Sequence, residues 1–182
     1  SRNQTGHTVE FIDERLLPKR FLLVSNRLPY QINVNGDRIS LKRGVGGLVT
    51  AMEPILQHTG GTWIGWSGTF DTVPERIQME EVAGSREYHL RPMSLSRREV
   101  DEYYLGYSNK SLWPLFHYFQ EYCELNRQQW EFYREVNQRF ADIVIKEYEE
   151  GDLIWVHDYH LLLVPAMVRR ALPNARIGFF LH

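Results

Sequence analysis

The sequence predicts an α/β fold in which a parallel sheet is flanked by helices and carries an inserted β-hairpin. Short apolar runs, typical of buried strands, alternate with longer segments of helical period. A glycine-rich turn precedes the first predicted helix, and the last third of the chain reads strand, helix, strand. Since parallel strands need crossover connections, this order indicates a Rossmann-like sheet.

The first half of the chain is predicted to hold most of the strands. They are expected at residues 21–25, 62–66, 76–82 and 88–93. Residues 30–42 alternate loosely around Asn35-Gly36, a strong hairpin turn signal. Gly44–Gly47 then opens a helix that runs to about His58.

The second half is predicted to be mainly helical before the sheet resumes. Ser96 and Glu99 have the spacing of a capping box, which starts a helix towards Tyr104. Further helices are expected at residues 112–118, 127–150 (ended by Gly151) and 161–171. Strands are expected at 153–156 and 177–181, the second of which delivers His182.

Length and composition favour one globular unit. Of the 182 residues, 43% are hydrophobic and 24% are charged, which are ordinary globular values. We predict a flexible lead-in at residues 1–19 and one Rossmann-like lobe at residues 20–182. The net charge of −2 and the absence of a basic block argue against a nucleic-acid surface.

Cysteine content and hydropathy bear on the compartment. Cys123 is the only cysteine, so neither an internal disulfide nor a cysteine-based zinc site can form. No run approaches the roughly 18 apolar residues of a membrane span, and no signal-peptide core is present at the start of the sequence. We therefore expect a cytoplasmic protein without a membrane partner.

Ionisable residues follow three of the predicted strands. Arg27 follows residues 21–25, Asp158 follows 153–156, and His182 follows 177–181. Ligands of parallel α/β sheets bind at the carboxyl ends of the strands, so Asp158 and His182 are expected side by side. Arg27 suits a phosphate or carboxylate, or is a surface arginine. Asp158 is a general base, an acceptor for a sugar hydroxyl, or an N-cap.

Two further groups are weaker candidates. The Gly46-Gly47 turn brings backbone N–H groups to a helix start, but it lacks the P-loop lysine and the dinucleotide spacing. Tyr104 and Trp113 could close over a sugar ring. His157 and His160 have no evident third ligand, so no metal is expected.

An ordered set of motifs resembles the trehalose-6-phosphate synthase family. It extends from Phe21 to His182, and the Leu-Trp-Pro and His-Asp-Tyr-His segments are its most specific parts. The matching segments are Val24–Pro29, Gly46–Leu48, Trp63–Gly68, Tyr103-Tyr104, Ser108-Asn109, Leu112–Tyr118, Trp155–His160 and Gly178–His182.

The resemblance implies a retaining glycosyltransferase of the GT-B fold that transfers glucose from UDP-glucose to glucose 6-phosphate, without a metal or other cofactor. It implies that Arg27 holds the acceptor phosphate, while Tyr104, Trp113 and Asp158 shape the acceptor-sugar pocket. His182 would contact the donor glucose, and Gly46-Gly47 would approach the donor diphosphate. Asp158 and His182 are thus the catalytic candidates, with Asp158 not a nucleophile.

The family also has a C-terminal lobe that carries the basic residues for the donor diphosphate, and this chain lacks it. The chain alone is therefore expected to be inactive. Other hypotheses are a relative with another acceptor, such as glycerol 3-phosphate or a cyclitol phosphate, and a non-catalytic sugar-phosphate sensor. A generic nucleotide-binding domain fits the glycine pattern poorly. The sequence leaves the oligomeric state open, a homo-oligomer included.

Overall fold

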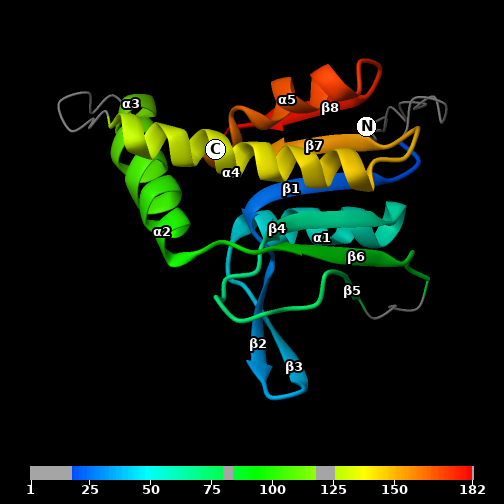
Figure 1. The fold of residues 1–182 in the computed structure, drawn as a ribbon. Coiled ribbons are helices and arrows are strands. Elements are labelled where there is room, and N and C mark those ends of the chain that lie inside the picture. The colour runs from blue at the N-terminus through cyan, green and yellow to red at the C-terminus, as the bar shows by residue number, and fades with distance from the viewer. Residues whose placement is uncertain (1–17, 80–83, 118–125, 182) are drawn as a thin grey trace, which may run out of the picture.

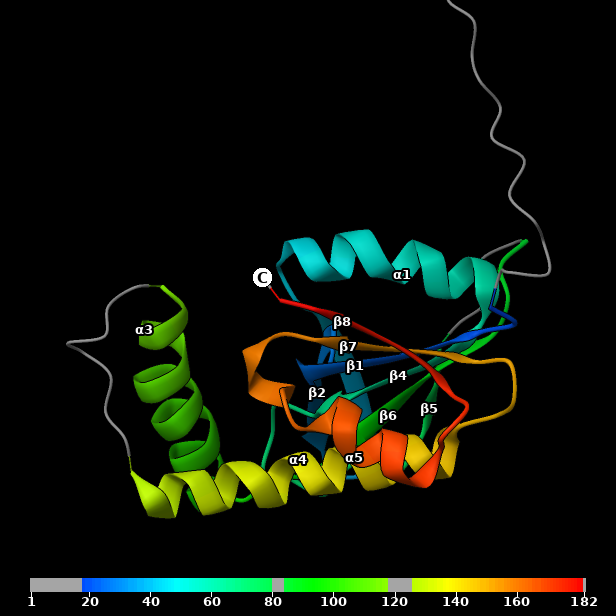
Figure 2. The same ribbon diagram turned by 90° about the horizontal axis from the view of Figure 1, so that it is seen from above.

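The computed structural model describes residues 18–79, 84–117 and 126–181. A six-stranded sheet of order β5-β6-β4-β1-β7-β8 lies between α1 on one face and α4 and α5 on the other (Figures 1 and 2). Its strands are β1 Phe21–Arg27, β4 Gly61–Trp66, β5 Ile77–Gln78, β6 Tyr88–Met93, β7 Leu153–His157 and β8 Arg176–Phe180. A separate hairpin is formed by β2 Tyr30–Asn35 and β3 Arg38–Arg43.

The helices lie in the segments that connect the strands. They are α1 Gly47–Thr59, α2 Arg97–Glu99, the π-helix η2 Val100–Leu112, α3 Trp113–Phe116, α4 Arg127–Glu147, the 3₁₀ turn η4 Tyr159–Leu161 and α5 Val164–Ala171. All neighbouring pairs in the sheet are parallel except β5 with β6. The predicted Rossmann-like architecture is therefore confirmed, with one short antiparallel strand at its edge.

Alternation along the central strand β1 divides the core between the two faces of the sheet. Leu22 and Val24 belong to the cluster under α4 and α5, whereas Leu23 belongs to the cluster under α1 and the hairpin. All three side chains are fully buried. Burial on both faces explains why β1 reads as a continuous apolar run.

Two predicted strand features differ in detail. The hairpin is confirmed, but Asn35 pairs with Arg38, so its two-residue turn is Gly36-Asp37 with Gly36 at φ 60°. The strand expected at 76–82 is only Ile77–Gln78 within the described residues. It runs antiparallel to β6 because it returns along the sheet edge directly before that strand, without a crossover.

The two helices predicted at 96–104 and 112–118 are one continuous helical run, α2–η2–α3, which lies beyond the carboxyl end of the sheet in both views (Figures 1 and 2). The capping box of Ser96 and Glu99 is confirmed. The stretch between the two predicted helices belongs to the π-helix η2, in which the Ser108 hydroxyl donates to the Tyr103 carbonyl at 2.8 Å. The residues between the two predicted helices pack against α4, and this burial favours a continuous helix rather than a loop.

The remaining helix boundaries shift by a few residues. The long helix ends at Glu147 rather than at 150, and the helix expected at 161–171 is divided into η4 and α5. The predicted lead-in (apart from residues 18 and 19), the single cysteine and His182 lie outside the described residues. None of the described helices is both long and apolar enough to traverse a bilayer.

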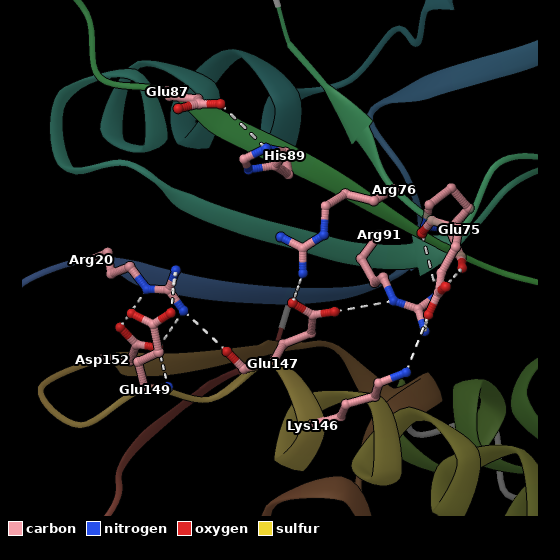
Figure 3. A network of polar contacts seen from close by, with 11 residues as sticks. Arg20, Glu75, Arg76, Glu87, His89, Arg91, Lys146, Glu147, Glu149 and Asp152 are labelled. Atoms are coloured by element: carbon pink, nitrogen blue, oxygen red, sulfur yellow. Dashed lines mark hydrogen bonds and ion pairs between the residues drawn. The ribbon is translucent and has the colours of Figure 1, made fainter.

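A network of ion pairs joins several strands of the sheet to the end of α4 (Figure 3). The Arg20 side chain, just before β1, donates to both carboxylate oxygens of Asp152, just before β7, at 2.8 and 3.0 Å. Arg76 and Arg91 both pair with Glu147 at the last turn of α4. Because these charges are satisfied by each other, they serve the fold.

Candidate active site at the carboxyl edge of the sheet

Arg27 projects from the carboxyl end of β1 as an exposed side chain. Its guanidinium carbon lies 5.3 Å from the centre of the Trp66 ring, a cation–π contact at the end of the neighbouring strand β4. Gly68 lies beneath it with φ 78°, and a Cβ there would be 2.8 Å from Arg27 Nη2. The backbone conformation therefore favours glycine, and a side chain at this position would displace the end of the arginine.

The backbone that carries Arg27 is fixed from behind. The Ser25 hydroxyl donates to the Arg27 carbonyl at 2.6 Å and accepts from the Trp63 indole at 2.8 Å. Asn26, which is buried, accepts from the hydroxyl of Tyr103 at 2.7 Å. The end of β1 is thus tied to the π-helix, and Arg27 presents its charge from a rigid support.

A cavity of about 430 Å³ adjoins Arg27. Its lining includes Lys42, Arg43 and the loop Gly44–Gly46, and no acidic residue. Gly46 is the N-cap of α1, and a Cβ at Gly46 or Gly47 would meet nothing within 4 Å. Cations and exposed backbone beside a helix N-terminus suit an anionic ligand. The structure therefore brings two predicted site elements, Arg27 and the glycine-rich loop, to one pocket.

Asp158 follows β7, the strand next to β1, and is half-buried. Its carboxylate accepts from the Tyr159 amide at 2.9 Å, so the N-cap interpretation is confirmed, although the turn that it caps is 3₁₀. Its amide donates to the Phe180 carbonyl at the end of β8 at 2.8 Å. Asp158 has φ 76° and ψ 170°, and it is the only non-glycine residue with positive φ among those described. Such strain is concentrated at functional sites.

His160 lies within this turn, and its ring contacts two phenol rings. Its ring centre is 4.1 Å from that of Tyr159 and 5.4 Å from that of Tyr104. Burial lowers the pKa of His160 to about 4, although the Asp158 carboxylate acts in the opposite direction. The imidazole is therefore neutral at physiological pH. The ring contact with His160 places Tyr104 against the loop that follows Asp158.

Two residues of α4, which the sequence analysis did not name as site residues, hold this loop. The Tyr133 hydroxyl donates to the Tyr159 carbonyl at 2.7 Å and accepts from the Leu162 amide at 3.0 Å. The Asn137 side chain donates to the His160 carbonyl at 3.0 Å and accepts from the Leu163 amide at 3.2 Å. The signal in the sequence that could have identified this role is an asparagine on an otherwise apolar helical face.

The remaining predicted site residues are Trp113, Gly47 and His182. Trp113 lies on α3 with 41% of its surface exposed, and its ring stacks on His117 at 4.1 Å. Gly47 is the first residue of α1. His182 is outside the described residues, although the hydrogen bond from Asp158 to Phe180 places the ends of β7 and β8 together. Within residues 18–79, 84–117 and 126–181, no three His, Cys, Asp or Glu side chains form a group that could hold a metal ion.

Comparison with protein families identifies the chain. The model of glycosyltransferase family 20 matches residues 19–182. The chain belongs to glycosyltransferase family 20. The mixed α/β sheet with its flanking helices agrees with the Rossmann-like lobe of a GT-B glycosyltransferase.

Two relatives are similar in sequence to this chain over most of its length. The trehalose-6-phosphate synthase of Mycolicibacterium smegmatis is 43% identical over 163 residues, which cover 89% of this chain and 31% of the relative. An Aspergillus niger protein named alpha,alpha-trehalose-phosphate synthase [UDP-forming] 1 is 42% identical over 168 residues, which cover 90% of this chain and 32% of the relative.

A solved family 20 structure shares the fold. The alpha,alpha-trehalose-phosphate synthase (UDP-forming) from Burkholderia xenovorans, in complex with glucose-6-phosphate, matches with a TM-score of 0.66 and 36% identity. The match covers 90% of this chain and 33% of that one. The chain thus spans about a third of the length of the proteins that it matches.

Proposed function

We propose that this chain is the acceptor-side lobe of a trehalose-6-phosphate synthase. The complete enzyme transfers glucose from UDP-glucose to glucose 6-phosphate with retention, and it yields trehalose 6-phosphate and UDP. The named relatives and the glucose-6-phosphate complex of the Burkholderia xenovorans enzyme support this proposal. The observation that carries it is the cavity in which Arg27 meets the loop Gly44–Gly46.

The electrostatics of that cavity fit two phosphate-bearing substrates. A hexose phosphate carries a charge near −2, and Arg27 offers a planar fork that bonds phosphate oxygens in pairs. None of the described carboxylates forms an ion pair with Arg27. Arg27 holds the acceptor phosphate in this proposal, and the amides of Gly46 and Gly47 approach the donor diphosphate.

The residues after β7 suit the uncharged part of the acceptor. The Asp158 carboxylate accepts hydrogen bonds from sugar hydroxyls, and Tyr104 and Trp113 supply aromatic surface for the ring. His182 contacts the donor glucose. The acceptor hydroxyl bonds the donor glucose on the face from which the diphosphate departs, and its proton passes to the displaced diphosphate. No residue of this lobe therefore acts as a nucleophile.

A second lobe completes the site in this proposal. It supplies the basic residues that face the donor diphosphate, and electrostatic contacts of this kind contribute the largest share of transition-state stabilisation. The chain alone therefore gives no turnover of UDP-glucose and glucose 6-phosphate. An enzyme-like rate from the isolated chain would contradict this division of labour.

The acceptor site is tested by isothermal titration of glucose 6-phosphate into the folded chain and into Arg27→Ala. We expect weak binding that Arg27→Ala reduces at least about tenfold, because a charge-assisted pair contributes roughly 1.5–3 kcal/mol. Arg38→Ala is the matched control, since Arg38 is exposed on the hairpin and outside the cavity. Equal binding by Arg27→Ala and the wild type would remove Arg27 from the acceptor site.

The substrate class is tested in the full-length protein. We expect trehalose 6-phosphate and UDP from UDP-glucose and glucose 6-phosphate, and no reaction with glycerol 3-phosphate. Turnover of glycerol 3-phosphate instead would show a related transferase with another acceptor. Binding of glucose 6-phosphate without any turnover would favour a non-catalytic sensor.

A further inference from the structure

Glu53 is a buried carboxylate that the proposed reaction does not use. It lies on the inward face of α1 with 6% of its surface exposed. One oxygen accepts from the hydroxyl of Tyr30 at 2.6 Å and from that of Tyr88 at 2.8 Å. The other oxygen pairs with Arg43 Nη2 at 2.9 Å. A buried charge is tolerated only when it is bonded in this way.

These partners come from three different elements. Tyr30 begins β2, Arg43 ends β3, and Tyr88 begins β6 of the main sheet. Tyr30 and Arg43 are directly paired across the hairpin. Glu53 therefore links both strands of the hairpin, at its base, to β6 of the main sheet and to α1.

Two chain segments that line the cationic cavity, residues 27–29 and 44–46, join the hairpin at its base. Leu28 and Pro29 separate Tyr30 from Arg27, and Gly44 follows Arg43 directly. The Gly44 amide donates to the Pro29 carbonyl at 2.7 Å, and this hydrogen bond holds the two segments together. A carboxylate that fixes this base therefore controls the glycine-rich loop.

Among the described residues, Arg43 is the only cation that pairs with Glu53. The phenols remain protonated donors, because burial and the hydrogen bond to Glu53 raise the pKa of Tyr30 to about 12 and raise that of Tyr88 further. Arg43 is itself half-exposed and lines the cavity beside Lys42. The pair thus holds one guanidinium at the cavity wall.

We propose that Glu53 is a positioning residue: it holds Arg43 and the loop Gly44–Gly47 in the arrangement that receives the diphosphate of the nucleotide-sugar donor. This inference rests on the proposed function, because it names the donor as the ligand of that loop. Glu53 contacts no substrate and acts through Arg43.

The test is a double-mutant cycle in the full-length enzyme with Glu53→Gln, Arg43→Gln and the double variant. We expect each single variant to raise the KM for UDP-glucose by about tenfold, because the loss of a charge-assisted hydrogen bond weakens binding by roughly tenfold or more and the exposure of Arg43 keeps the effect at the lower end. The KM for glucose 6-phosphate should change less than about twofold. In the Arg43→Gln background, Glu53→Gln should add nothing, since both changes break the same link.

Glu87→Gln is the matched control, because Glu87 is an exposed carboxylate outside the cavity. Tyr88→Phe keeps the charge of Glu53 and removes one hydrogen bond, so a smaller rise in the same KM is expected, and it serves if Glu53→Gln does not fold. Additive effects in the cycle, or equal rises in both KM values, would overturn the proposal.

Hydrogen exchange of the Gly44 amide gives a readout that does not depend on activity. We expect faster exchange in Glu53→Gln than in Glu87→Gln, whichever reaction the enzyme performs. Absence of synthase activity in the wild type would defeat the proposed function alone, whereas an unchanged Gly44 amide would defeat the role of Glu53 alone.

Discussion

The candidate site has two sides that are built in opposite ways. The cationic side, formed by Arg27, Lys42, Arg43 and Gly44–Gly46, is exposed and lined by basic residues and glycine backbone. The packed side, formed by Asp158–Leu163 with Tyr133 and Asn137, is half-buried to buried and held by hydrogen bonds to α4. Arg27 ends β1, and Asp158 follows β7, the neighbouring strand of the same sheet.

The difference indicates how the work of recognition is divided. A phosphate can be attracted by exposed cations with little shape constraint, whereas sugar hydroxyls need groups at fixed positions. The packed side obtains that fixed position from core residues of α4. Changes on the packed side should therefore alter stability, and changes on the cationic side should alter binding.

The largest expected stability effect on the packed side is a pH effect of His160. Burial lowers its pKa from the ordinary 6.5 to about 4. Between these values the unfolded chain binds a proton that the folded chain excludes, so the free energy of unfolding falls as pH falls from about 6.5 to about 4. The contribution is on the order of 3 kcal/mol.

Urea unfolding at several pH values measures this effect. His160→Phe should flatten the slope between pH 4 and pH 6.5 relative to the wild type, because the variant has no proton to exclude. His58→Gln, at an exposed position in the last turn of α1, should keep the wild-type slope. A wild-type slope in His160→Phe would show that the imidazole titrates normally.

Asn137→Ala should cost the next largest amount of stability. It leaves the Leu163 amide and the His160 carbonyl without their side-chain partner inside the protein. We expect a loss of about 2 kcal/mol in the free energy of unfolding, measured by urea denaturation.

The neighbouring Gln138→Ala is the control for that substitution. Gln138 is exposed and bonds only Asp142 on its own helix, so its loss should stay within about 0.5 kcal/mol. Equal losses at the two positions would mean that the loop after Asp158 does not depend on α4.

Sequence reasoning predicted the positions of Arg27 and Asp158 because both follow short apolar runs whose ends are sharp. It could not predict that α2, η2 and α3 form one run, since a π-helix does not follow the 3.6-residue period by which helices are predicted. The antiparallel direction of Ile77–Gln78 was missed for a similar reason, because a short strand has the same alternation in either direction.

The supporting residues of the site were missed because helical periodicity marks a face as inward without saying what it meets. Tyr133 and Asn137 share the core face of α4 with Phe140, but they bond a loop rather than pack against a strand. Glu53 likewise occupies an inward position on α1, and its partners come from segments that only the tertiary fold brings together.

The smallest predicted effect concerns the backbone of Asp158. At φ 76° and ψ 170° the residue occupies a region that is favourable essentially only for glycine. Asp158→Gly and Asp158→Ala both remove the carboxylate, so the difference between them isolates the backbone strain. We expect the glycine variant to be the more stable by about 1 kcal/mol, measured by urea denaturation.

Ser40, an exposed residue of β3, provides the reference pair. At an ordinary strand position glycine is less stable than alanine by roughly 0.5–1 kcal/mol, so Ser40→Gly should unfold more easily than Ser40→Ala. A reversed order at Asp158 alone would show that the packed side stores strain to place its carboxylate. The same order at both positions would show that Asp158 costs the fold nothing, and the rigidity of this side would then rest on the α4 hydrogen bonds alone.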